Sequence, residues 1–331
     1  MFSPFLFDTK KQITACHGGV VCQIGGMVKR VILLAAALGV VGSPAFAQDK
    51  TKKQSREETI SKALDGLEVS KPTKVRKMLV FSLTKGFRHG SIPTGKTCMT
   101  LMGKKTGAFE AVISDDLIHF EPENISKFDA ICFLNTTQSV FSLSKKELKG
   151  LSDDDKKRAA KREARLKKSL MDFIKSGKGF VGIHAASDTF YEWPEYGRMI
   201  GGYFDGHPWR SNTPVSVKVE DGEEKHACCA HFEGKNLNFK EEIYQFKAPY
   251  DPKKLHMLLR LDPEQTDISI GKRKDNDYGV SWIKHHGQGR VFYCSLGHNH
   301  HIYENPKVLQ HYLKGIQWAL GDINVEVKPG N

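Results

Sequence analysis

Gly179-Phe-Val-Gly-Ile-His-Ala-Ala-Ser-Asp188 is the stretch of the sequence that decides the fold. Its apolar first half predicts a buried strand that ends at His184, and the small residues after it predict a sharp turn. In an open α/β sheet, ligands bind at the carboxyl ends of the strands, where an imidazole can act in catalysis or bind a metal near neutral pH. His184 also occupies the position at which a strand-to-helix elbow holds a serine or cysteine nucleophile. The sequence therefore predicts a site at the end of this strand, with an imidazole nitrogen in place of a serine oxygen or cysteine sulfur.

Apolar runs alternate with helical segments in the first half of the chain. Strands are expected at Arg76–Leu83, Phe109–Ser114, Asp129–Leu134 and Lys178–His184. A helix should follow the first loop and end near Lys105. A long charged helix should run from Ser152 to Gly177, because serine starts helices and glycine ends them. Continuous apolar strands that alternate with helices predict a parallel sheet covered on both faces.

The second half of the chain changes character. Five strands are expected there without helices between them, at Pro214–Glu220, Glu242–Phe246, Leu255–Leu261, Val280–His285 and Arg290–Leu296. His286-Gly-Gln-Gly289 predicts a hairpin turn between the last two, and Asn305–Leu320 predicts a closing amphipathic helix. The expected fold class is therefore α/β: a mostly parallel sheet with helices on both faces and an antiparallel C-terminal extension.

The N-terminal segment predicts export. Residues 1–47 contain a basic pair (Lys29 and Arg30), a short apolar run and an Ala45-Phe-Ala47 cleavage site, which together are typical of a signal peptide, with initiation at Met27 as an alternative start. The apolar run is too short for a membrane span, so none is expected in the mature chain, which would be periplasmic or extracellular. Residues 48–74 are interpreted as a polar tether or a helix outside the core, 75–322 as the domain and 323–331 as a tail.

Charge and cysteine content narrow the class of protein. The formal net charge is +12, but the basic residues gather in two lysine-rich runs without interleaved aromatic residues, so no nucleic-acid partner is expected. Five cysteines would remain after cleavage, an odd number with no CxxC spacing. They do not form a disulfide framework, so the fold must depend on its hydrophobic core.

Histidines follow several of the predicted strands. His89 comes after the first strand, His184 after the fourth and His298 after the last. The loops after parallel strands open at the same edge of a sheet, so His89 and His184 can meet although they are far apart in the chain. Each histidine could also simply satisfy backbone groups of its loop.

Two chemical interpretations of this set stay open. In one, a divalent metal (zinc or similar) is bound by His89, His184 and His207 together with a carboxylate, although no HxH or HExxH spacing supports it. In the other, His184 and His298 are general acid and base, and Asp188 or Glu242 fixes a tautomer. The candidate catalytic residues are accordingly His89, His184, His298 and Asp188.

Polar and aromatic residues near these histidines suggest a carbohydrate ligand. Aromatic rings pack on the apolar faces of sugars, and charged side chains bind the hydroxyl groups. The candidate substrate-binding residues are Lys85, Arg88, Tyr191, Trp193, His207, Trp209 and Glu242. The alternative is that the aromatic residues serve only loop packing.

Four ordered motifs carry a family resemblance. Lys85-Gly-Phe-Arg-His-Gly-Ser-Ile92, Gly182-Ile-His-Ala-Ala-Ser-Asp188, Tyr196-Gly-Arg-Met-Ile-Gly-Gly-Tyr-Phe204 and Ser295-Leu-Gly-His298 resemble the trehalose-utilisation (ThuA-like) family over Val75–Gly321. The resemblance implies a flavodoxin-like fold of the class I glutamine amidotransferase type and a role in sugar catabolism on a glycoside or keto-sugar. Amidotransferases of this fold carry a cysteine where this chain has His184, so glutaminase activity is not expected.

The function expected from the sequence is therefore that of an exported sugar-directed hydrolase, lyase or isomerase. The alternative is a non-catalytic carbohydrate-binding or accessory module. A small-molecule carbohydrate is the expected partner, and no pattern in the sequence predicts the oligomeric state.

Overall fold

The computed structural model of the protein describes residues 44–328, and the side chains from residue 54 onward. All but the last four residues of the expected signal peptide lie outside this range. The described residues from Ala45 onward form one compact unit. Among the described residues, no helix combines the length and the apolar character that crossing a membrane requires.

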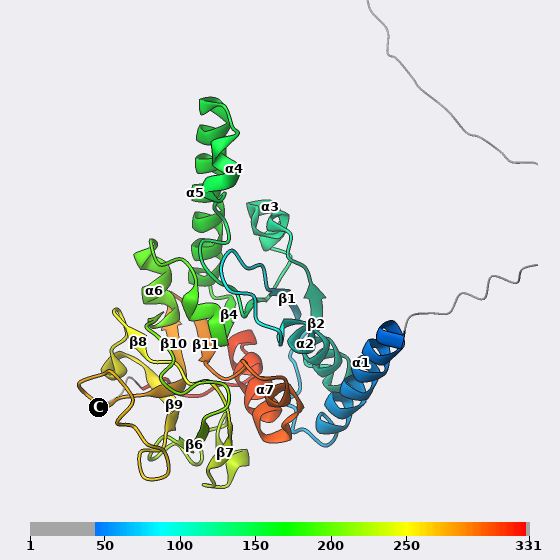
Figure 1. The fold of residues 1–331 in the computed structure, drawn as a ribbon, viewed down its shortest axis with the longest axis vertical. Helices are drawn as coiled ribbons and strands as arrows, with labels where there is room; N and C mark the ends of the chain where they lie inside the picture. The colour runs from blue at the N-terminus through cyan, green and yellow to red at the C-terminus, as the bar shows by residue number, and fades with distance from the viewer. Residues whose placement is uncertain (1–43, 329–331) are drawn as a thin grey trace, which may run out of the picture. The chain divides into compact units, whose positions relative to one another are not determined.

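A nine-stranded mixed sheet forms the centre of this unit (Figure 1), in the order β2-β1-β3-β4-β11-β10-β9-β6-β7. The parallel half consists of β1 (Lys77–Phe81), β2 (Glu110–Ile113), β3 (Ala130–Leu134), β4 (Gly179–Ile183) and β11 (Gly289–Cys294). The antiparallel extension consists of β10 (Gly279–His286), β9 (His256–Leu261), β6 (Pro214–Val219) and β7 (Leu237–Lys240). A separate pair joins β5 (Tyr203–Phe204) to β8 (Phe246–Lys247). The fold class expected from the sequence is confirmed.

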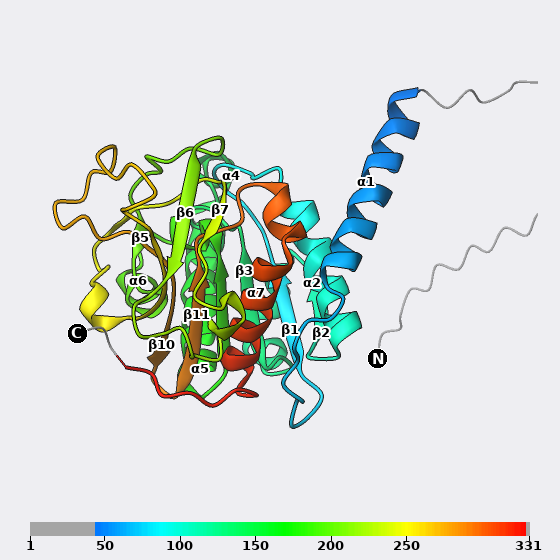
Figure 2. The ribbon, with the colours of Figure 1, turned by 90° about the horizontal axis from the view of Figure 1, so that it is seen from below.

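Helices cover both faces of the sheet (Figure 2). The α-helices are α1 (Pro44–Ala63), α2 (Ile92–Thr106), α3 (Pro122–Ile125), α4 (Lys145–Lys149), α5 (Asp153–Lys175), α6 (Pro194–Ile200) and α7 (Pro306–Leu320). Short 3-10 helices are η1 (Leu117–Phe120), η2 (His184–Asp188), η3 (Ala230–Phe232), η4 (Pro252–Lys254) and η5 (His300–Glu304).

The core has two layers because successive strand residues point to opposite faces. In β1, Met78 and Val80 join a cluster that includes residues of α2 and α7, whereas Leu79 and Phe81 join a cluster that includes residues of α5 and α6. All four side chains are fully buried. This burial on both sides explains why the strand reads as an uninterrupted apolar run.

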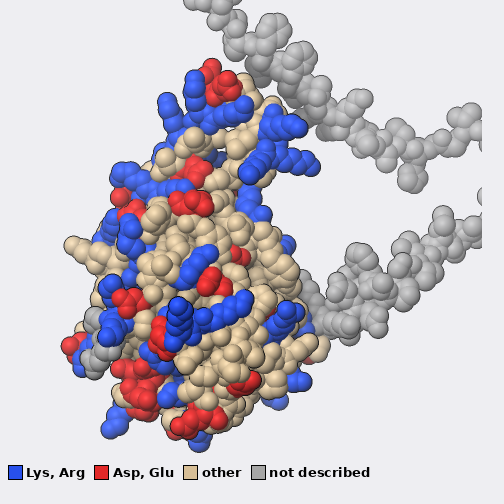
Figure 3. Space-filling model, turned by 60° about the vertical axis from the view of Figure 1, so that its left-hand side comes forward, with Lys and Arg blue, Asp and Glu red and all other residues tan. Residues whose placement is uncertain are grey.

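Helix α5 begins and ends as the sequence predicts. The Ser152 hydroxyl accepts from the Asp155 N–H at its start, and Gly177 adopts a left-handed φ of 105° just after its end. Its last turns pack on the sheet, whereas its first turns extend beyond it. In Figure 3 the basic side chains at this end are mixed with acidic ones, in agreement with exposed ion pairs such as Lys156–Asp153.

Two expectations from the sequence need correction. The strand expected at Glu242–Phe246 is absent except for Phe246, which begins the short β8. The sheet strand β6 pairs with β7, and residues 242–245 run beside residues 206–209, where Ile243 N–H donates to the Trp209 carbonyl. The segment 48–74 is more than a tether, since Ile60 and Leu64 of the α1 region are buried in the core. Ile60 lies in the last turn of α1 and Leu64 in the turn that follows it, and Leu67 packs partly buried against the same core.

Candidate active site

His184 turns the chain at the end of β4. Its backbone φ of 50° is left-handed, which costs a residue with a side chain about 1–2 kcal/mol and needs surrounding structure to hold it. The loop after β11 comes close here because Gly297, with φ 135°, has no side chain. A Cβ on Gly297 would lie 3.1 Å from the His184 Cβ and 2.8 Å from the Tyr303 hydroxyl.

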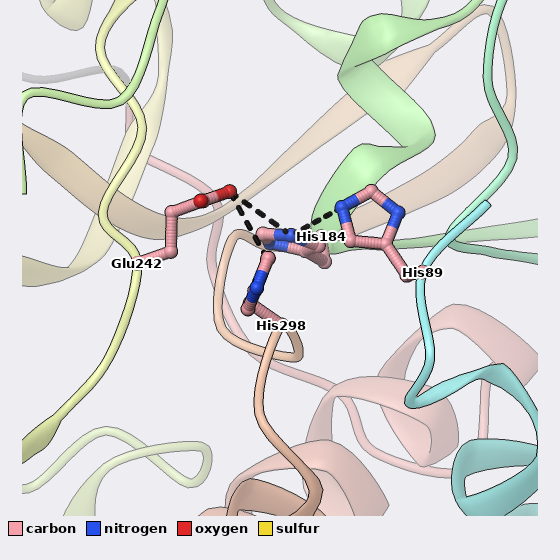
Figure 4. A group of neighbouring side chains, drawn as sticks. All are labelled: His89, His184, Glu242 and His298. Carbon is pink, nitrogen blue, oxygen red and sulfur yellow. Dashed lines mark hydrogen bonds and ion pairs between the residues drawn. The ribbon is translucent and has the colours of Figure 1, made fainter. Parts of the chain in front are cut away.

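Four side chains from four separate loops meet at this point (Figure 4). His89 lies between β1 and α2, His184 follows β4, Glu242 follows β7 and His298 follows β11. Nε2 of His184 lies 3.2 Å from Nε2 of His89 and 3.6 Å from Oε1 of Glu242. Nδ1 of His298 lies 3.2 Å from the same Glu242 oxygen. The convergence of His89 and His184 expected from the sequence is therefore present.

Hydrogen bonds fix the tautomer of His184. Its Nδ1 lies 2.6 Å from the Ser295 carbonyl oxygen, which can only accept, so Nδ1 carries the proton. The lone pair of Nε2 therefore faces the other three side chains. The Tyr244 hydroxyl, 3.0 Å away, donates to that nitrogen.

Burial sets the protonation of the group. It lowers the pKa of His89 to about 4, with help from the neighbouring His298, and it lowers the pKa of His184 well below its ordinary value. Burial also depresses the pKa of His298, but contact with Glu242 and the charges of Glu242 and Glu241 outweigh it and raise that pKa. His89 and His184 are thus neutral at neutral pH, the state in which an imidazole binds a metal.

Three of the separations between the four ligand atoms match the edge of a tetrahedral metal site. Zinc binds imidazole nitrogen and carboxylate oxygen at about 2.0–2.2 Å, so neighbouring ligands of a tetrahedral site lie roughly 3.3–3.5 Å apart. The three contacts given above, 3.2, 3.6 and 3.2 Å, agree with this edge length. All four atoms lie within 4.8 Å of one another. His89, His184, Glu242 and His298 could therefore hold a divalent cation.

A second group of this kind, Glu223, His226 and His256, lacks the necessary tautomers. The Cys228 N–H donates to Nδ1 of His226 over 3.2 Å. The Lys328 N–H donates to Nδ1 of His256 over 2.8 Å. An accepting Nδ1 forces the proton of a neutral imidazole onto Nε2, which then cannot ligate a metal. Nε2 of His256 lies 2.9 Å from a carboxylate oxygen of Glu223 and faces it as a donor.

Some of the other expected site residues lie next to the group and others do not. His207 contacts it from the outside, with Nδ1 3.5 Å from Oε2 of Glu242 and a side chain that is 42% exposed. The set of His89, His184 and His207 expected as metal ligands thus differs from the observed group, which contains His298 and Glu242. The Asp188 carboxylate instead accepts hydrogen bonds from Tyr191 and Gln138.

Both tryptophans expected to bind substrate are packing residues. Trp209 is fully buried, and its indole N–H donates to the Asp267 carbonyl. Trp193 packs against Phe190 and Tyr196 below the Lys167 ammonium. These contacts agree with the alternative that the two tryptophans serve loop packing. Of the two basic residues, Lys85 pairs with Glu147 and Arg88 is exposed.

The aromatic rings beside the four candidate metal ligands belong to residues other than the expected tryptophans. Phe87 is 65% exposed, and its ring lies edge-to-face against His89 with a centroid distance of 4.8 Å. On the other side, Phe204 stacks on His207 at 5.8 Å and contacts Tyr244. Sequence reasoning missed Phe87, Tyr244 and Glu241; the adjacent acids Glu241-Glu242 before an apolar run were the available signal for the last.

Fold and site together define a class of protein: flavodoxin-like α/β proteins of the class I glutamine amidotransferase type, with a histidine at the elbow that follows the central strand. The sequence model of the trehalose-utilisation family, ThuA, matches residues 77–319, and the chain belongs to this family. The family implies a role in trehalose utilisation and a carbohydrate-related context.

Solved structures with the same fold agree with this assignment. The chain is similar to a ThuA-like protein from Bacteroides uniformis, with a TM-score of 0.55 and 20% identity over 77% of this chain and 95% of that one. It is also similar to a ThuA-like protein from Parabacteroides merdae, with a TM-score of 0.51 and 16% identity over 78% of this chain and 95% of that one. At these identities the likeness shows the fold alone. No curated protein matches the chain.

Proposed function

We propose that this protein is an enzyme of sugar catabolism that acts on a glycoside or keto-sugar, as a hydrolase, lyase or isomerase, with a divalent metal at His89, His184, Glu242 and His298. The observation that carries the proposal is the Nε2 lone pair of His184, which is directed at the other three side chains by the bond from Nδ1 to Ser295. Membership of the ThuA family supplies the carbohydrate context.

The charge of the group supports a cation. Glu241 and Glu242 are 0% and 6% exposed, and no lysine or arginine within the described residues forms an ion pair with either. Burial raises the pKa of Glu241 to about 7, and the only ion-pair partners of Glu242 within the described residues are histidines. Buried carboxylate charges are normally paired or bind a metal. A divalent ion would balance the pair.

The chain's own residues provide the other functions that such an enzyme needs. A bound divalent ion would polarise a substrate oxygen. His207 is half exposed beside Glu242, where it can take up or release a proton at the outer side of the group. Phe87 offers an exposed ring for the apolar face of a sugar, and Arg88 offers donors for its hydroxyl groups.

The test combines metal analysis with product detection. Purified full-length protein should contain one zinc or similar ion per chain by plasma mass spectrometry. NMR should show conversion of one compound in a panel of glycosides and their keto derivatives. His184→Ala should lose both properties, and the exposed His301→Gln should keep both. Binding of a sugar by the metal-loaded protein without any product would favour the non-catalytic module instead, and undiminished turnover by His184→Ala would contradict the proposal.

We also propose that the protein is exported and cleaved after Ala47. The basic pair, apolar run and Ala45-Phe-Ala47 site support this. Cleavage would remove only the first residues of α1, and Ile60 is the first buried side chain of this helix among those described, from residue 54 onward. Mass spectrometry of the protein from a periplasmic fraction should find a chain that begins at Gln48, and an uncleaved chain retained in the cytosol would contradict export.

A further inference from the structure

Glu241 is a fully buried carboxylate that does not contact the imidazoles directly. Its Oε1 accepts from three successive backbone N–H groups, those of Gly297 (3.1 Å), His298 (2.6 Å) and Asn299 (3.3 Å). Oε2 accepts from the Asn299 N–H as well, at 3.1 Å. Consecutive N–H groups that converge on one anion form a nest, and hydrogen bonds to a charged group are stronger than neutral ones.

The captured segment is the loop that carries His298. This segment, residues 297–299, follows β11 after Ser295 and Leu296, and its first residue, Gly297, has a positive φ of 135°. A loop of this kind would otherwise be among the more mobile parts of a fold. With the loop backbone fixed, Nδ1 of His298 is held 3.2 Å from Oε1 of Glu242.

Two adjacent glutamates therefore have different partners in one site. Glu242 contacts the rings of His184, His207 and His298, whereas Glu241 contacts only the backbone that positions one of those rings. The same loop has a second attachment, since the Asn299 side-chain amide donates to the Ser211 and Lys240 carbonyls. That neutral attachment provides a matched comparison for the charged one.

We propose that Glu241 is a positioning residue of the site, whose carboxylate binds the backbone N–H groups of residues 297–299 and thereby sets the place of the His298 imidazole as a metal ligand. This inference rests on the metal site proposed above. It assigns to Glu241 no contact with substrate and no place in the coordination of the ion.

The experiment compares zinc affinity, loop structure and stability in the full-length protein. Zinc affinity is measured by competition with a chromophoric chelator for the native protein, Glu241→Gln, Glu241→Ala and His298→Ala. Outer-shell partners of metal ligands typically contribute tenfold to a hundredfold in affinity, so Glu241→Ala should fall in this range. Glu241→Gln should lose less zinc affinity, because the amide oxygen of the glutamine can still accept hydrogen bonds from the backbone N–H groups. This variant also tests the proposal if Glu241→Ala does not fold.

Two controls separate positioning from general stability. Asn299→Ala removes the neutral attachment and should change zinc affinity less than Glu241→Ala does. Leu309→Ala, in the core on α7, should lower the free energy of unfolding without lowering zinc affinity. In the metal-free protein, the amide proton shifts of residues 297–299 should move upfield in Glu241→Gln and stay in place in Leu309→Ala.

The outcomes distinguish this inference from the metal proposal. If His298→Ala weakens zinc binding but both Glu241 variants bind zinc like the native protein, the positioning role is overturned. If His298→Ala binds zinc normally, the metal set is wrong, and the role of Glu241 is then judged by the three amide shifts alone. Unchanged shifts in Glu241→Gln would overturn it.

Discussion

Nε2 of His184 and Nε2 of His89 lie 3.2 Å apart, although the two residues are separated by 95 positions in the chain. Two ring nitrogens at this distance either share a proton or face a common cation. Sharing would require His89 to donate to a lone pair that the Tyr244 hydroxyl already uses. A metal ion would be bound by both rings, with the lone pair of His184 Nε2 directed at the ion in place of the Tyr244 hydroxyl, and it would also favour the charged forms of Glu241 and Glu242.

Removal of divalent ions should therefore destabilise the native protein. A ligand present at about a hundred times its Kd stabilises the folded state by about 2.7 kcal/mol, so a chelator should lower the Tm by several degrees and zinc should restore it. His184→Ala should be insensitive to both treatments. His226→Ala should keep the full response, because the tautomers of His226 and His256 do not suit a metal. The reverse pattern would place the metal in the second group.

Tyr244→Phe should have an effect that depends on the metal. In metal-free protein it removes a buried hydrogen bond to His184, at a cost of about 1 kcal/mol in the free energy of unfolding. In zinc-loaded protein the lone pair is used by the ion, so the loss should be smaller. Tyr196→Phe removes a buried bond to the Ala186 carbonyl and should cost the same in both states. Chemical denaturation with and without zinc measures both, and an equal loss for Tyr244→Phe in the two states would contradict ligation by His184.

Phe87→Ala should weaken sugar binding about threefold to tenfold, because aromatic contacts are worth roughly 0.5–1.5 kcal/mol. The side chain is 65% exposed, so the free energy of unfolding should barely change. Ile118→Ala, in η1 and 44% exposed, is a matched surface control and should leave binding unchanged. Calorimetric titration with a glycoside substrate measures the effect. Native affinity in Phe87→Ala would mean that the sugar binds elsewhere.

The sequence predicted those parts of the fold that depend on repeating patterns. The uninterrupted apolar runs of β1, β3 and β4 can be explained only by burial on both faces, and a parallel sheet follows from that. The strand expected at Glu242–Phe246 was wrong apart from Phe246, because burial of this segment does not come from a place in the main sheet. All five residues are buried, but their backbone is held by single contacts, such as that of Gln245 N–H with the Gly206 carbonyl.

The site was predictable where it depends on strand ends and not where it depends on loop conformation. His89, His184 and His298 each follow a strand of the parallel half, so topology alone brings them to one edge. Glu242 and His207 lie in long loops whose path no periodicity specifies. The importance of Glu241 is visible only after three backbone N–H groups are seen to converge on it.

A pH effect on stability should arise far from the site, at His311 of α7. This ring is fully buried, with Nδ1 2.8 Å from the Cys228 carbonyl and Nε2 2.8 Å from the Ser281 hydroxyl. Burial lowers its pKa to about 3, and the nearby His231 and His226 act in the same direction. In the unfolded chain a histidine has a pKa near 6.5, so between about pH 6.5 and 3 the unfolded state binds more protons than the folded state.

The stability contributed by the neutral His311 ring is therefore complete above pH 6.5 and is lost as the pH falls. By pH 5 the loss attributable to this residue should be about 2 kcal/mol. His311→Gln should show a correspondingly flatter decline of unfolding free energy between pH 7 and 5, whatever its stability at pH 7, whereas exposed His301→Gln should follow the native curve. Chelator in every sample keeps the metal site out of the comparison. A native slope in His311→Gln would show that the ring is protonated within the fold, with water or the Ser281 hydroxyl accommodating its second proton.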